Sequence, residues 1–315
     1  MNFLVLGGCG YLGSLLIREY LPAEFPNSLI RIYDNMFKDR YVTLFDLPEN
    51  ATYEMVQGDV RDKEMLAKAF ENIDVAIYQA DITNAPLSFE RKELTEAVNY
   101  QGAMNAFRQA IKTKIKKFIY TSSASVYGPT SGIVDETFDC KPISPYGIFK
   151  LKAETEGMKL AKEKGLNAVA LRLGTVVGYS IGMRFDTILD VFSFQASIGK
   201  PLSVYDSALK EARPYVHVRD VCRAYIWAIK NDDIKGEIIN IVGDNWNMTQ
   251  VIDTLKKYIP DLKYQIVSTP SLNQLSYKLD DSKARKYGFE PKFTIEQGIE
   301  ELLKKFRQLR KYHYY

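Results

Sequence analysis

A glycine-rich turn stands between the first apolar run of the chain and a helical pattern. The run covers residues 3–6, and the turn reads Gly7-Gly8-Cys9-Gly10-Tyr11-Leu12-Gly13. Glycines permit a tight turn and let the backbone approach an anion that the positive end of the following helix attracts. This order of strand, glycine turn and helix predicts a parallel α/β fold whose first turn binds a pyrophosphate group.

Short apolar runs alternate with amphipathic stretches through the first half of the chain. Runs of this length that end in Gly or Asp are typical of buried parallel strands, and the amphipathic stretches between them predict helices. The expected strands cover residues 3–6, 29–33, 53–56, 75–78, 118–120 and 168–173, and the expected helices cover 63–71, 94–111 and 146–164. The order predicts a doubly wound parallel (Rossmann) sheet with right-handed crossovers.

After about residue 175 the alternation becomes irregular. The patterns predict a helix at 186–197, a strand at 213–218, a helix at 221–230, a strand at 237–242 and two further helices near the C-terminus. We therefore expect a dinucleotide-binding domain at residues 1–175 and a smaller, irregular α/β substrate-binding region at 176–315. Elements around residues 215–245 are expected to return to the first domain.

Composition argues against several classes of partner. Among 315 residues, 42 are basic and 39 acidic, and a formal charge of +3 is too low for a nucleic-acid-binding surface. Cys9, Cys140 and Cys222 have no spacing that would build a zinc site or a disulfide framework. No stretch approaches the ~18 apolar residues of a membrane span, and the N-terminus lacks a basic signal region. We expect a cytoplasmic protein with no metal, nucleic acid or membrane partner.

A carboxylate at the end of the second expected strand indicates which dinucleotide binds. Asp34 can accept hydrogen bonds from both adenosine ribose hydroxyls, whereas a 2′-phosphate would meet like charge, so NAD is expected in preference to NADP. Arg31 and Lys38 are close enough in sequence to soften this preference. Residues after successive strands are expected to contact NAD, because ligands of such sheets bind at the strand ends. They are Gly7, Gly10, Tyr11, Leu12, Gly13, Asp34, Asn35, Asp59, Val60, Gln79 and Ala80.

A tyrosine and a lysine four residues apart indicate proton-transfer chemistry. Tyr146 and Lys150 are expected on one face at the start of the helix at 146–164. The strand at 118–120 leads into Thr121-Ser122-Ser123, which supplies hydroxyls at the same edge of the sheet. An unperturbed tyrosine titrates near 10, so a base that works near pH 7 needs a pKa lowered by about 3 units. A neighbouring lysine and a cationic nicotinamide ring are expected to provide this.

Together these motifs resemble the NAD-dependent epimerase/dehydratase family of extended short-chain dehydrogenases, over essentially the whole chain. Asn99 in Val98-Asn99-Tyr100-Gln101-Gly102 and the segment Arg213-Pro214-Tyr215-Val216-His217 add to the resemblance. It implies that Tyr146 is the general base and acid on a sugar hydroxyl and that Lys150 holds the nicotinamide ribose. It places Thr121 and Asn99 close to NAD. Ser123 matches the serine of UDP-galactose 4-epimerases that binds the reacting oxygen.

The resemblance also implies a substrate site for a nucleoside-diphosphate sugar. Arg213 is expected at the pyrophosphate, with Arg184 as a second candidate, and Thr175 stands where UDP-sugar 4-epimerases usually carry Asn. His217 is expected to be a structural hydrogen-bonding residue on its strand. Those epimerases also have an Arg-Pro pair where this chain reads Thr269-Pro270-Ser271.

A narrower similarity connects residues 171–178, 183–186 and 276–279 with a subgroup that includes nucleotide-heptose 4-dehydrogenases. Dehydratases of the family place Asp-Glu where this chain has Ala124-Ser125. We therefore expect oxidation at C4 of the sugar, by a 4-epimerase or a 4-dehydrogenase, in a homodimer that pairs the helices at 94–111 and 146–164. A nucleotide 4-keto-sugar reductase and a non-catalytic NAD-binding regulatory protein remain as alternatives. The regulatory proteins typically lose the tyrosine or the lysine.

Overall fold

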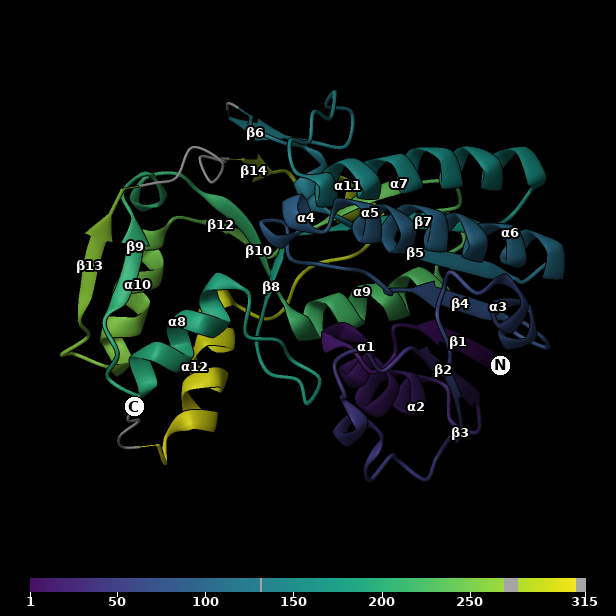
Figure 1. The fold of residues 1–315 in the computed structure, drawn as a ribbon, viewed down its shortest axis with the longest axis horizontal. Helices are drawn as coiled ribbons and strands as arrows, with labels where there is room; N and C mark the ends of the chain where they lie inside the picture. The colour runs from purple at the N-terminus through teal and green to yellow at the C-terminus, as the bar shows by residue number, and fades with distance from the viewer. Residues whose placement is uncertain (131, 269–276, 310–315) are drawn as a thin grey trace.

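The computed structural model describes residues 1–130, 132–268 and 277–309, and its centre is a seven-stranded parallel sheet (Figure 1). The strand order is β3-β2-β1-β4-β5-β7-β11. The strands are β1 (Asn2–Leu6), β2 (Leu29–Asp34), β3 (Thr52–Gln57), β4 (Val75–Tyr78), β5 (Lys117–Ser123), β7 (Ala168–Leu173) and β11 (Ile238–Ile241). The expected doubly wound parallel fold is confirmed, with the chain order reversing between β1 and β4.

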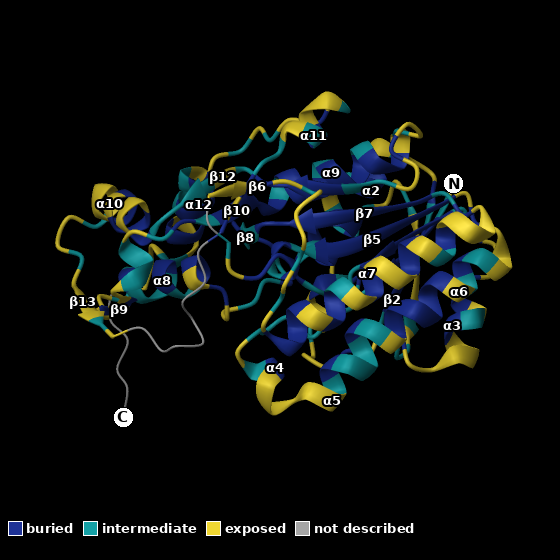
Figure 2. Cartoon of the chain, turned by 90° about the horizontal axis from the view of Figure 1, so that it is seen from above, coloured by how far each residue is buried: buried dark blue, intermediate teal, exposed yellow. Residues whose placement is uncertain are grey.

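Helices cover both faces of this sheet. One face carries α1 (Tyr11–Leu15), η1 (Leu16–Tyr20), α2 (Leu21–Glu24) and α9 (Val218–Lys230), and the other α3 (Lys63–Ala69), α6 (Ala103–Thr113) and α7 (Pro145–Lys164). Side chains along β1 alternate between the two layers: Phe3 and Val5 join one apolar cluster, and Leu4 and Leu6 join the other. Figure 2 shows the central strands β5 and β7 as buried.

Local signals explain where the helix that carries Tyr146 and Lys150 begins and ends. Ser144 accepts a hydrogen bond from the Gly147 backbone N–H at 3.1 Å, and Pro145 occupies the first turn of α7. Gly165 ends the helix with a φ of +75°. Tyr146 is therefore fixed in the first turn, with Lys150 directly behind it.

Several expected boundaries differ from the structure, most clearly in the helix expected at 94–111 and at the start of α9. The helix expected at 94–111 is a run of α5 (Lys92–Thr95), the π-helical segment η3 (Glu96–Gly102) and α6, preceded by α4 (Leu87–Glu90). The strand expected at 213–218 ends at His217, and α9 begins three residues earlier than expected, at Val218. The reason is a side-chain cap, because the His217 Nδ1 accepts a hydrogen bond from the Arg219 backbone N–H.

The irregular second half forms a smaller region beside the sheet (Figure 1). It contains the small sheet of β8 (Thr175–Val177), β10 (Arg213–His217) and β12 (Asp244–Trp246), and the pair β9 (Leu202–Tyr205) and β13 (Tyr264–Val267). Its helices are α8 (Ile188–Ser197), α10 (Met248–Tyr258) and α12 (Ile295–Phe306). The short pair β6 (Ile133–Val134) and β14 (Lys278–Leu279) and the helix α11 (Ser282–Lys286) lie nearer the large sheet. The domain boundary near residue 175 stays a prediction.

The helices of the described ranges were also compared with the needs of a membrane span. Among them, none is both long enough and apolar enough to cross a bilayer.

Candidate active site

The glycine turn leaves an open cradle at the start of a helix. Gly7 has a φ of +84°, and a Cβ on it would lie 2.8 Å from the Ala80 backbone nitrogen. A Cβ on Gly13 would lie 2.6 Å from the Gly7 carbonyl oxygen. Around Gly10, by contrast, that carbonyl oxygen, at 3.1 Å, is the one described atom within 4 Å of such a Cβ. This open backbone at the helix start fits the pyrophosphate of a dinucleotide.

Asp34 stands beside this cradle at the end of β2. Its Oδ2 accepts the Cys9 backbone N–H at 3.0 Å, and its Oδ1 accepts the Met36 backbone N–H at 2.9 Å. The two bonds hold the carboxylate next to the glycine turn. Arg31 is bound elsewhere, because its guanidinium pairs with Glu54 at 2.7 Å and donates to backbone carbonyls near the end of α3.

The ends of β2 and β3 meet at this edge of the sheet. The Asn35 carboxamide donates to Asp59 at 3.3 Å, and the Arg61 guanidinium beside Asp59 lowers the pKa of that carboxyl to about 2. Val60 is buried, and its carbonyl accepts a hydrogen bond from Asn105. Asn35, Asp59 and Val60 therefore form one group at the expected adenine end of the cofactor site.

The three expected catalytic residues come together where β5 and α7 meet. Ser123 ends β5, and its hydroxyl is close enough to the phenol of Tyr146 to act against the rise in the pKa of that phenol. Lys150, one turn further along α7, is fully buried and donates to the Thr121 carbonyl oxygen. The Thr121 hydroxyl lies 2.7 Å from the hydroxyl of Tyr225 on α9. This arrangement can pass a proton to or from a substrate hydroxyl placed against Ser123 and Tyr146.

The protein's own groups do not lower the pKa of Tyr146, so the expected lowering by Lys150 together with a nicotinamide ring stays a prediction. Burial raises the pKa of Tyr146 well above its ordinary value, and the Asp81 carboxylate raises it further, while Ser123 and Arg184 act in the opposite direction. The physical reason lies in the position of the lysine, whose Nζ is 2.7 Å from Asp81 Oδ2. A carboxylate at that distance offsets the positive charge of the ammonium, so the lysine does little to favour a phenolate at Tyr146.

Asp81 is the site residue that the sequence analysis missed. Its side chain is 5% exposed, and burial raises its pKa to about 6, although Lys150 opposes the rise. The Asn99 carboxamide fixes the adjoining backbone, because it accepts the Ile82 N–H at 2.8 Å and donates to the Ile82 carbonyl at 3.0 Å. Asn99 therefore supports the turn that carries Asp81. One feature of the sequence could have identified Asp81: it directly follows Gln79 and Ala80, which come after an expected strand.

A segment of the second half packs directly on the glycine turn, and we call residues 178–183 the crossing segment. The Tyr11 hydroxyl donates to the Gly178 carbonyl, and the Ser180 hydroxyl donates to the Tyr11 carbonyl at 2.7 Å. The Gly182 N–H donates to the Ser14 hydroxyl at 3.0 Å. Gly182 lies so close to the turn that a Cβ there would be 2.6 Å from the Gly10 carbonyl oxygen.

Arg184 directly follows the crossing segment. Its guanidinium pairs with Asp186 at 3.0 Å and lies near enough to lower the pKa of both Tyr146 and Asp81. Arg184 Nη1 is buried and has no hydrogen-bond partner among the described residues. The charge of this expected substrate residue therefore acts on the tyrosine of the expected site.

The other expected substrate residues lie on the small sheet. Arg213 begins β10 and Thr175 begins β8, and both are near Tyr215, which faces Thr175 in the strand register. Residues 269–271 lie outside the described residues. His217 acts as expected on its strand, because its Nδ1 caps α9 and its Nε2 lies 3.5 Å from Glu301.

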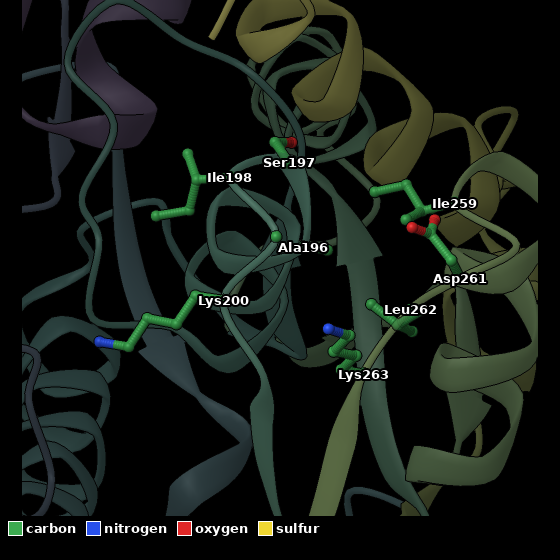
Figure 3. A pocket seen from close by; sticks show the side chains of 9 residues that line it. Ala196, Ser197, Ile198, Lys200, Ile259, Asp261, Leu262 and Lys263 are labelled. Carbon is green, nitrogen blue, oxygen red and sulfur yellow. The ribbon is translucent and has the colours of Figure 1, made fainter. Parts of the chain in front are cut away.

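A separate pocket of about 340 Å³ lies between the end of α8 and the end of α10 (Figure 3). Residues 196–200, 259 and 261–263 line it, and none of them belongs to the expected site. The chemistry described above therefore lies elsewhere, at the carboxyl edge of the large sheet.

Comparisons with known proteins extend over nearly the whole chain. The model of the NAD dependent epimerase/dehydratase family matches residues 3–242. A dTDP-D-glucose 4,6-dehydratase of Homo sapiens is 26% identical, with 97% of this chain and 89% of the relative covered. A UDP-glucose 4-epimerase of Thermotoga maritima, solved with UDP-glucose, is 26% identical with a TM-score of 0.86, covering 98% of this chain and 99% of that one. A UDP-glucuronic acid 4-epimerase from Bacillus cereus, solved with UDP-glucuronic acid and NAD, is 25% identical with a TM-score of 0.87, covering 98% and 100%.

Proposed function

Because the chain belongs to the NAD-dependent epimerase/dehydratase family, we propose that it oxidises C4 of a nucleoside-diphosphate sugar as a 4-epimerase or a 4-dehydrogenase. The observation that carries the proposal is the meeting of Ser123 at the end of β5 with Tyr146 in the first turn of α7, with Lys150 one turn behind and bonded to the Thr121 carbonyl. Relatives that bind UDP-glucose or UDP-glucuronic acid support the substrate class. The retained tyrosine and lysine argue against a purely regulatory protein.

The residues present fit NAD, the cofactor of the family. The open backbone at Gly10 suits the pyrophosphate, and Asp34 suits the adenosine ribose hydroxyls. Asn35, Asp59 and Val60 would lie at the adenine, and Lys150 with Thr121 near the nicotinamide ribose. When bound, NAD supplies the acceptor for a hydrogen and an electron pair from the sugar carbon.

The protein's own groups would manage the proton. Ser123 would hold the C4 hydroxyl oxygen by a hydrogen bond, so that the hydroxyl hydrogen points at the Tyr146 oxygen. Tyr146 would take this proton during oxidation and return it when an epimerase restores the alcohol. Positioning of this kind supplies much of the rate in such reactions, because it removes the orientational cost of bringing the groups together.

The residues directly after Ser123 favour a reaction confined to C4. Ala124 and Ser125 begin the short helix η4 (Ala124–Val126). Neither side chain offers the carboxyl group that the dehydratases of the family carry at these positions. A 4-keto-6-deoxy sugar is therefore not the expected product, although one of the relatives is a 4,6-dehydratase.

Arg184 and Arg213 would hold the charged part of the substrate. A guanidinium offers paired donors that suit phosphate oxygens. Arg184 Nη1 is buried and has no hydrogen-bond partner within the described parts of the chain, which supports a ligand contact, and Thr175 and Arg213 would bind further along the substrate. We propose Arg213 as the main diphosphate residue.

Replacement of Tyr146 by Phe tests the function directly. The variant loses only the proton-carrying oxygen, so we expect unchanged NAD binding and a turnover reduced by roughly 10² to 10⁴-fold. UDP-glucose, UDP-glucuronic acid and dTDP-glucose would each be incubated with the protein and NAD. Formation of NADH reports dehydrogenation, and nuclear magnetic resonance of the sugar reports inversion at C4.

Tyr258→Phe is the matched control, because Tyr258 lies on α10 and is 40% exposed. It should retain full turnover. If Tyr146→Phe kept more than about a tenth of the wild-type rate, Tyr146 would not be the general base.

A further inference from the structure

Asp81 and Lys150 form an ion pair that is almost entirely shielded from solvent. The Nζ to Oδ2 distance is 2.7 Å, and the two side chains are 5% and 0% exposed. The ammonium also donates to the Thr121 carbonyl and lies 4.3 Å from the centre of the Tyr120 ring. Asp81 Oδ1 is buried without a hydrogen-bond partner among the described residues. Removing both charges from water has a large free-energy cost, so such a buried pair adds little to the net stability of the fold. Its presence therefore calls for a functional explanation.

The charge of the carboxylate acts on the reacting tyrosine, which lies one helical turn before Lys150 on α7. It opposes loss of the proton from Tyr146, and the Arg184 guanidinium is the cation that partly offsets it. The titratable and charged groups near the pair come from several elements. They are Tyr146, Lys150 and Glu154 on α7, Tyr78 on β4, Tyr120 on β5, Tyr225 on α9, Tyr277 before β14 and Arg184 before α8.

Backbone contacts keep Asp81 in this place. Asn99 binds both polar groups of the Ile82 backbone, and the π-helical segment η3 brings Asn99 to that turn. The carboxylate is therefore held against Lys150 inside the protein rather than swinging into solvent. A fixed charge at short range acts strongly in a buried site, because little water screens it.

We propose that Asp81 is a positioning residue, which holds the Lys150 ammonium and whose negative charge sets the pH range in which Tyr146 accepts the sugar proton. This inference rests on the proposed role of Tyr146 as the base. The sign follows from the charges. Removing a carboxylate that repels the phenolate makes Tyr146 easier to ionise, so the acid limb of the activity profile moves to lower pH.

Asp81→Asn tests the proposal, because it keeps the shape of the side chain and removes its charge. We expect the acid limb of kcat/KM to move to lower pH by about one unit or more, as expected for loss of one nearby buried charge. A second readout needs no substrate. The near-ultraviolet absorbance of tyrosinate, taken as the difference between each protein and its Tyr146→Phe counterpart, should appear at lower pH in the Asn variant.

Matched variants separate this effect from a general loss of structure. Asp232→Asn also removes a carboxylate beside a buried lysine, since Asp232 lies 2.8 Å from Lys117 at the opposite end of β5, and its profile should equal that of the wild type. Asp81→Glu keeps the charge and should restore the wild-type limb. Circular dichroism would confirm folding, and Asp81→Ala would replace an Asn variant that does not fold.

The outcomes distinguish this inference from the proposed function. An unmoved acid limb together with unmoved tyrosinate absorbance in Asp81→Asn would overturn the role of Asp81. Absence of any Tyr146-dependent turnover in the wild type would overturn the proposed function, and the absorbance comparison would still decide the effect of Asp81 on Tyr146.

Discussion

At the scale of single residues, cofactor choice depends on Asp34. Each of its carboxylate oxygens accepts one backbone hydrogen bond, which leaves lone pairs free for ribose hydroxyls. Arg40 lies close enough for the Asp34 carboxylate to raise its pKa, although burial lowers that pKa overall. In the wild type, the negative charge of Asp34 therefore partly offsets the positive charge of Arg40.

Asp34→Ala should relax the preference for NAD over NADP. Loss of two charged hydrogen bonds to ribose should weaken NAD binding by roughly ten- to hundred-fold, whereas Arg40, freed from its carboxylate, should favour a 2′-phosphate. Calorimetric titration with both dinucleotides measures the change. Glu49→Ala, an exposed position on the same loop, should leave both affinities unaltered. Equal or tighter binding of NADP by the wild type would contradict the assignment.

Part of the catalytic arrangement can be predicted from the sequence. The four-residue spacing of Tyr146 and Lys150 predicts a shared helix face, and the strand end at Ser123 predicts the same sheet edge, because both follow from local periodicity. The pairing of Lys150 with Asp81 could not be derived in this way. It depends on how deeply these two side chains, which are far apart in the sequence, are buried together. Burial decides the direction in which the pKa of each group moves.

At the scale of elements, the contact between the crossing segment and the glycine turn connects the two halves of the chain. The contact joins residues about 170 positions apart in the sequence, such as Tyr11 and Ser180. No periodic pattern predicts it, whereas all six strands expected in the first half are found. The alternation of short strands and helices depends on neighbouring residues in the sequence. The contact of the crossing segment with the glycine turn depends on the whole fold.

Gly182→Ala should loosen this contact. A methyl group there would lie 2.6 Å from both the Gly10 carbonyl oxygen and the Ser14 hydroxyl, so the segment must shift away from the turn. We expect a loss of about 1–3 kcal/mol in the free energy of unfolding and a weaker affinity for NAD, because the backbone of the cradle moves with the segment. Thermal unfolding with and without NAD measures both effects.

Gly243→Ala provides the comparison, since the nearest atom to its Cβ would be 3.3 Å away and the position lies beyond β11. It should cost less stability and leave the affinity for NAD unchanged. Equal effects of the two substitutions would show that the crossing segment does not support the cradle.

At the scale of the whole molecule, the large sheet collects the site from both halves of the chain. Its carboxyl edge receives the turns after β1, β2, β4 and β5, and the crossing segment closes the site from the side of the smaller region (Figure 1). The doubly wound order made this edge predictable, because parallel strands bring all their carboxyl ends together. The shape of the smaller region was less predictable, since its short strands pair across long stretches of sequence.

The expected homodimer would form through the outer surface of η3 and α7. Ile148 is 41% exposed there, and Lys152 lies over the Tyr100 ring, whose hydroxyl donates to Glu156. An isologous contact would bring this surface, which carries apolar, basic and acidic side chains, against its own copy. Light scattering after size exclusion should therefore give twice the 36.0 kDa mass of one chain.

Ile148→Glu should convert the dimer to a monomer, because it replaces an exposed apolar side chain of this surface by a carboxylate, and a twofold contact brings two such charges into one interface. Ile266→Glu is the matched control, since Ile266 on β13 is 57% exposed and lies far from α7 along the molecule (Figure 1). The control should remain dimeric. A wild-type protein that stays monomeric at every concentration, or a dimer that Ile266→Glu dissociates and Ile148→Glu does not, would show that α7 is not the interface.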